Sequence, residues 1–87
     1  MIEDQFRELI KNKRVLVTGG TGSIGRVIVQ SLLKYEPRVI RVLSRDAIKQ
    51  IGFQAELGAA TNVRFIMGDI RDAERILMAC EDIDIIF

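Results

Sequence analysis

The sequence predicts an α/β fold in which a parallel sheet is covered by helices. Short apolar segments rich in β-branched residues alternate with longer segments whose apolar residues recur at helical spacing. This alternation is typical of parallel strands joined by crossover helices, and such connections are right-handed. The predicted strands are residues 14–18, 39–43, 63–67 and 84–87.

Four helical segments accompany these strands. The first is an amphipathic helix within residues 1–12, ahead of a unit that spans 13–87. Gly58 is a predicted C-cap and Asp72 a predicted N-cap, because glycine and aspartate suit those positions. Helical spacing assigns four apolar faces, which are Ile2, Phe6, Leu9 and Ile10; Ile24, Val27, Ile28, Leu32 and Tyr35; Ile48, Ile51 and Ala55; and Ala73, Ile76, Leu77 and Cys80.

Composition narrows the class of protein. The chain has 87 residues, of which 48% are hydrophobic and 29% charged, and its net charge is +1. One small globular domain is expected, without the basic surface that nucleic-acid binding requires. Cys80 is the single cysteine and there is no histidine, which argues against a disulfide or a zinc cluster. The acidic start "MIEDQ" lacks the basic region of a signal peptide, and no apolar run approaches the length of about 18 residues that crosses a bilayer, so a cytoplasmic protein without membrane contact is expected.

A glycine-rich turn follows the first strand in the stretch "RVLVTGGTGSIGRVIVQ". Gly20, Gly22 and Gly25 fit the pattern G-x-G-x-x-G, and a helical segment follows them. A Walker A loop is excluded because Arg26 stands where the lysine is required, and a kinase loop would be followed by a strand. A strand before and a helix after these glycines favour a dinucleotide-binding turn of Rossmann type.

In such a turn, backbone N–H groups at the start of the helix hold the pyrophosphate. A strand–helix connection without a ligand is the alternative. The residues that the dinucleotide hypothesis assigns to the cofactor are Gly19, Gly20, Thr21, Gly22, Ser23, Ile24 and Gly25. The same fold predicts the strand order 3-2-1-4, with the first two crossover helices on one face and the third on the other.

The end of the second strand bears on the choice of cofactor. An acid at this place accepts hydrogen bonds from the ribose of NAD, whereas an arginine nearby accommodates the 2′-phosphate of NADP. Ser44 stands at the acidic position and Arg45 follows it, which favours NADP unless Arg45 is only a surface charge. Asp46 directly precedes a helical segment and suits an N-cap. Asp69, after the third strand, is either an acceptor for the adenine amino group or a turn-forming residue.

Three segments, "VLVTGGTGSIG", "VLSRDAIKQ" and "FIMGDIRD", together resemble the extended short-chain dehydrogenase/reductases. They are most similar to the polysaccharide-biosynthesis branch of UDP-N-acetylglucosamine 4,6-dehydratases. The resemblance implies that Ser44, Arg45 and Lys49 contact the 2′-phosphate of NADP. It also implies that Asp69 and Ile70 contact the adenine, and that the substrate is a nucleotide sugar.

The family uses a Tyr-x-x-x-Lys pair for proton transfer, and the single tyrosine of this chain, Tyr35, is not part of one. No catalytic residue and no metal ligand are therefore predicted. The chain is interpreted as the NADP-binding portion of a dehydratase, truncated after the fourth strand. The alternatives are a stand-alone NADP-binding module and a fragment of a related epimerase or reductase. An apolar edge at residues 84–87 predicts a homo-oligomer.

Overall fold

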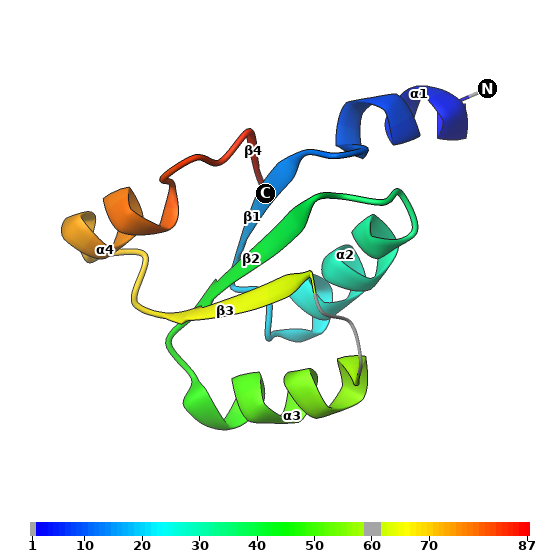
Figure 1. The fold of residues 1–87 in the computed structure, drawn as a ribbon. Helices are drawn as coiled ribbons and strands as arrows, with labels where there is room; N and C mark the ends of the chain where they lie inside the picture. The colour runs from blue at the N-terminus through cyan, green and yellow to red at the C-terminus, as the bar shows by residue number, and fades with distance from the viewer. Residues whose placement is uncertain (1, 59–61) are drawn as a thin grey trace.

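The four strands form one parallel sheet in the order β3-β2-β1-β4 (Figure 1), as predicted. The structure is a computed structural model that describes residues 2–58 and 62–87. The side chain of Glu3 lies outside this description. The elements are α1 (Ile2–Ile10), β1 (Arg14–Thr18), α2 (Ser23–Leu33), β2 (Val39–Ser44), α3 (Ala47–Leu57), β3 (Val63–Met67), α4 (Ala73–Ala79) and β4 (Ile85–Ile86).

The central strands β1 and β2 pair over the whole length of β1, from Arg14 opposite Val39 to Thr18 opposite Leu43. The edge strand β4 is shorter than the predicted 84–87, since only Ile85 and Ile86 are strand residues. Backbone hydrogen bonds to β1 nevertheless continue on both sides of it, from Asp84 N to Arg14 O and from Phe87 N to Leu16 O, each 2.8 Å.

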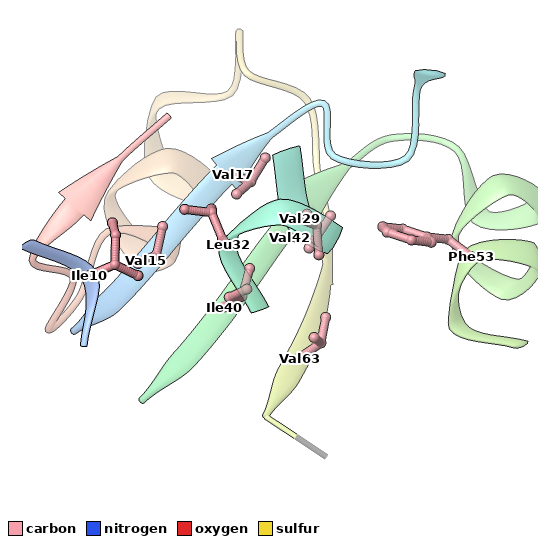
Figure 2. Packing of buried hydrophobic residues seen from close by; sticks show 9 residues of the cluster. All are labelled: Ile10, Val15, Val17, Val29, Leu32, Ile40, Val42, Phe53 and Val63. Carbon is pink, nitrogen blue, oxygen red and sulfur yellow. The ribbon is translucent and has the colours of Figure 1, made fainter. Parts of the chain in front are cut away.

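Side chains of the strands alternate between two apolar layers. Helices α2 and α3 cover one face of the sheet and α4 covers the other (Figure 1), as predicted. On the first face, Val15 and Val17 pack with α2, and Phe53 reaches in from α3 (Figure 2). On the second face, Leu16 and Leu43 pack with Ala79 of α4. Both faces of the central strands are therefore buried, as parallel sheets require.

The predicted inward face of α3 is wrong, and that of α2 is only partly right, because Leu32 is buried and Ile28 and Tyr35 pack against the same core. Ile24 and Val27 of α2 are exposed, and so are Ile48, Ile51 and Ala55 of α3, with Ile48 83% exposed. The buried residues are Gly25, Val29 and Leu32 in α2, and Gln50 and Phe53 in α3.

Two close contacts rotate these helices away from the orientation that apolar spacing predicts. Gly25 brings α2 against the backbone of the glycine turn, where a side chain would not fit. In α3, Gln50 Nε2 donates to the carbonyls of Ser44 and Ile66, at 3.1 and 3.0 Å. The carboxyl ends of β2 and β3 thus hold the side-chain amide of Gln50 between them. This orientation of α3 turns Phe53 toward the core.

The faces of α1 and α4 were also only partly predicted. Only Ile10 of the predicted α1 face is buried, while Ile2 and Leu9 are exposed. In α4, Ile76 and Cys80 pack inward beside Ala79, but Leu77 points outward. Ala73 at the start of α4 is exposed as well.

The predicted helix caps are confirmed. Asp46 Oδ1 accepts from Lys49 N at 3.0 Å, and Asp72 Oδ1 accepts from Arg75 N at 3.2 Å. Gly58 is the C-cap of α3, with a φ of 60° that favours glycine. Within residues 2–58 and 62–87, no helix has the length and apolar character needed to span a bilayer, and no metal-binding cluster of His, Cys, Asp or Glu is found.

Candidate dinucleotide-binding site

The glycine turn joins β1 to α2, and three of its glycines are explained by the chain itself. Gly19 has a φ of +67°, which L side chains rarely adopt. A Cβ on Gly20 would lie 2.5 Å from Val42 Cγ1, and one on Gly25 would lie 2.5 Å from the Cα of Gly20. At Gly20 and Gly25, strand, turn and helix are therefore packed too closely for a side chain.

Gly22 has no such internal reason. It is the N-cap of α2, its φ of −74° suits any residue, and the nearest atom to an added Cβ is Gly19 O at 3.6 Å. Within residues 2–58 and 62–87, no side chain caps α2, whereas Asp46 and Asp72 cap α3 and α4. Bare backbone at an uncapped helix start is what a phosphate group needs if it is to approach the N–H groups closely. These residues fit a dinucleotide pyrophosphate.

A pocket of about 490 Å³ opens beside the turn, at the carboxyl ends of β1, β2 and β3. Ligands of open α/β sheets bind at this edge. Five predicted site residues are among those that line it, namely Gly19, Ser44, Arg45, Asp69 and Ile70. The predictions omitted Thr18, Leu43, Gly68 and Arg71, which line it too. The other predicted residues, Gly20, Thr21, Gly22, Ser23, Ile24, Gly25 and Lys49, lie outside this lining.

Asp69 carries the strongest electrostatic feature of the pocket. Its carboxylate accepts from Arg71 Nη2 at 2.7 Å, from Arg71 N at 2.9 Å and from Arg45 Nη1 at 3.5 Å. The hydrogen bonds from the Arg71 side chain, followed by the one from its backbone, hold the pKa of Asp69 well below 3.8, although partial burial opposes the shift. Asp69 is therefore a carboxylate at neutral pH.

Ser44 is buried and connects the pocket to the glycine turn. Its Oγ lies 2.7 Å from Thr21 Oγ1, and it also accepts from Asp46 N at 3.2 Å. The hydroxyl of Ser44 carries no charge. The acid that would accept hydrogen bonds from an NAD ribose is therefore absent from the position before Arg45. Lys49 is exposed in the first turn of α3.

Arg26 is a supporting residue that the sequence did not predict. Its Nε donates to Thr21 O at 3.0 Å, its Nη2 to Lys49 O at 3.3 Å, and its Nη1 to Glu56 Oε1 at 2.6 Å. The guanidinium carbon also lies 5.1 Å from the centre of the Phe53 ring. Arg26 thus holds the glycine turn against α3. Its position directly after Gly25, the last glycine of the motif, is the only sequence feature that points to this role.

Residues 15–87 match the sequence profile of the family described as polysaccharide biosynthesis protein. The chain belongs to this family. A protein of Methanocaldococcus jannaschii, named as an uncharacterized membrane protein, is 44% identical over 88% of this chain and 23% of its own length. A UDP-N-acetylglucosamine 4,6-dehydratase (inverting) of Campylobacter jejuni is 38% identical, over 90% of this chain and 23% of its own length. The chain therefore spans about a quarter of the relatives that it matches.

Solved structures confirm the fold. The X-ray structure of Pen from Bacillus thuringiensis is 42% identical with a TM-score of 0.88, over 90% of this chain and 24% of that one. RhlG of Pseudomonas aeruginosa, solved with NADP, is 29% identical with a TM-score of 0.72, over 87% and 32%. WbmF of Bordetella bronchiseptica, solved with NAD+ and UDP, has this fold at 23% identity and a TM-score of 0.69, over 91% and 23%. The predicted resemblance to extended short-chain dehydrogenase/reductases is thus confirmed.

Among the pocket residues that the sequence did not predict, Arg71 makes the most contacts with a predicted site residue. It follows Asp69 by two residues in "GDIRD", and that spacing allows its backbone N–H to close a turn on the aspartate side chain. The sequence signal was therefore an aspartate followed by an arginine at i+2. The sequence analysis predicts Asp69 as an adenine acceptor or a turn-forming residue, but not the ion pair that Arg71 makes with it.

Proposed function

We propose that this chain binds NADP and forms the cofactor-binding portion of a nucleotide-sugar 4,6-dehydratase of the UDP-N-acetylglucosamine type. The observation that carries the proposal is Gly22, a glycine at an uncapped helix start that no contact with the described part of the chain explains. Membership of the polysaccharide biosynthesis protein family and similarity to a dehydratase of this type support the substrate class.

Each group of the cofactor has a candidate partner. The N–H groups of Ser23, Ile24 and Gly25, at the start of α2, would face the pyrophosphate, and the helix dipole favours its charge. Asp69 would accept from the adenine amino group, while the exposed Ile70 offers an apolar surface to the ring.

The 2′-phosphate would lie against the end of β2. Arg45 is 72% exposed and offers a planar fork that can donate two hydrogen bonds to phosphate oxygens. Lys49 lies one helical turn further on and can add a second positive charge. Ser44 can donate to the same phosphate while the Thr21 hydroxyl donates to Ser44 Oγ.

The bound nicotinamide would accept and return a hydride, and this chain would contribute binding and orientation to that chemistry. Tyr35 packs against Phe6, with ring centres 5.4 Å apart, in the core around α1 and α2. It is therefore not placed for proton transfer at the pocket. The whole protein's dehydration chemistry, its nucleotide-sugar substrate and a cytoplasmic setting belong to the same proposal.

The test compares 2′-phospho-ADP-ribose with ADP-ribose by calorimetric titration of the chain. A single charge-assisted contact from an exposed arginine should favour the phosphorylated ligand by about tenfold. Arg45→Ala should remove most of this preference. Arg38→Ala is the matched control, because Arg38 is exposed just before β2, at the opposite edge of the sheet. Equal binding of the two ligands, or an unchanged preference in Arg45→Ala, would show that Arg45 does not select NADP.

A further inference from the structure

Two arginines contact the same carboxylate in the pocket, and their contacts are unequal. Arg71 Nε donates to both carboxylate oxygens of Asp69, at 3.1 and 3.2 Å, and Arg71 Nη2 donates at 2.7 Å. The backbone N–H of Arg71 adds a fourth contact at 2.9 Å. Arg45 makes one contact at 3.5 Å from the end of another strand. Arg71 is thus held to Asp69 by several hydrogen bonds, whereas Arg45 makes a single long contact with it.

The carboxylate cannot serve every partner at once. An ionised aspartate offers about four acceptor sites, and Arg71 with its backbone N–H takes most of them. An adenine amino group that reached Asp69 would have to use the site that now faces Arg45. Arg45 can leave without exposing an uncompensated carboxylate, because Arg71 remains in place.

We propose that Arg71 is a positioning residue, which holds the Asp69 carboxylate in a fixed orientation and so leaves Arg45 free to bind a 2′-phosphate. This inference rests on the proposed function of the same pocket. Without Arg71, Arg45 would be the remaining guanidinium beside Asp69 and would pair with it more fully. The carboxylate within the chain would then compete with the phosphate of the ligand for Arg45.

If the inference is correct, Arg71 affects the choice of ligand only through Asp69. The effect of Arg71→Ala is therefore measured both with Asp69 present and with Asp69→Asn. In Arg71→Ala, the preference for 2′-phospho-ADP-ribose over ADP-ribose should fall about two- to fivefold, the range expected of an exposed ion pair. In the double variant Asp69→Asn/Arg71→Ala, the preference should return to that of Asp69→Asn alone, because no carboxylate competes for Arg45. Arg38→Ala again serves as the control.

Two results would overturn the inference. If Arg71→Ala leaves the preference unchanged, Arg45 is independent of Arg71. If the loss persists in the Asp69→Asn background, Arg71 contacts the phosphate directly and is not a positioning residue.

A measurement without ligand separates this inference from the proposed function. Carbon-13 NMR titration of the Asp69 carboxyl should show its pKa rising toward 3.8 in Arg71→Ala, since the largest cause of its depression is then absent. A pKa that stays low in Arg71→Ala would overturn the positioning role. If neither nucleotide binds the unaltered chain, the proposed function fails, and the titration still decides whether Arg71 controls Asp69.

Discussion

Alanine substitutions at Gly25 and Gly22 should affect different properties. Gly25→Ala should lower stability, and Gly22→Ala should weaken nucleotide binding. A Cβ at Gly25 would lie 2.5 Å from the Cα of Gly20, and a backbone atom cannot rotate aside. Overpacking costs about 1–3 kcal/mol, and a clash with backbone falls in the upper part of that range, about 2–3 kcal/mol, of which the better helix propensity of alanine returns roughly 1 kcal/mol. Gly25→Ala should therefore lower the free energy of unfolding by about 1–2 kcal/mol. With a urea m-value near 1 kcal/mol/M, the midpoint should fall by about 1–2 M.

Gly22→Ala should leave stability almost unchanged. The added Cβ has its nearest contact at 3.6 Å, which is ordinary van der Waals distance. Alanine at an N-cap costs about 0.5–1 kcal/mol, but the loss of glycine's freedom in the unfolded chain returns a similar amount. A side chain at this N-cap would stand at the start of α2, where the proposed pyrophosphate binds, so affinity for 2′-phospho-ADP-ribose should fall by roughly tenfold or more.

Urea unfolding followed by circular dichroism, with calorimetric titration of the same samples, measures both effects. The reasoning is refuted if Gly25→Ala unfolds at the same urea concentration as the unaltered chain. It is also refuted if Gly22→Ala binds the nucleotide as before, because the absence of a side chain at Gly22 would then have no connection with a ligand.

Three further predictions concern stability and association. The pKa of Asp69 is depressed in the folded chain, so its stabilising contribution is complete above about pH 4 and is lost as the pH falls below that. Urea midpoints measured at decreasing pH should show this loss of stability. Arg71→Gln should make the loss smaller. Phe53→Ala should cost about 3–5 kcal/mol because Phe53 is fully buried, whereas Ile51→Ala on the exposed face should change stability by less than about 0.5 kcal/mol in the same assay. The exposed edge beside Ile86 should let copies of the chain associate, and sedimentation should show concentration-dependent mass that Ile86→Lys abolishes; equal mass in both proteins would exclude this edge.

The order of the elements followed from local patterns, and the reason is that each signal lies within a few residues. β-branched apolar runs marked β1, β2 and β3 with their observed bounds or within one residue of them. Asp46, Gly58 and Asp72 were recognised as caps because a cap depends on backbone groups no more than four residues away. Strand order then followed from the handedness of the crossovers, which is a property of all such chains.

The sequence by itself determined the sheet, the glycine turn between β1 and α2, and the chemical types at the candidate site. Only the tertiary structure decided how α2 is rotated about its axis, which way α3 faces and how the charges of the pocket are paired. Apolar spacing could not reveal that Gly25 and Gln50 would orient these helices, since their partners lie in other elements. The link from Arg45 to Asp69 joins the ends of two strands 24 residues apart in sequence. Contacts between elements depend on packing, and no local pattern encodes them.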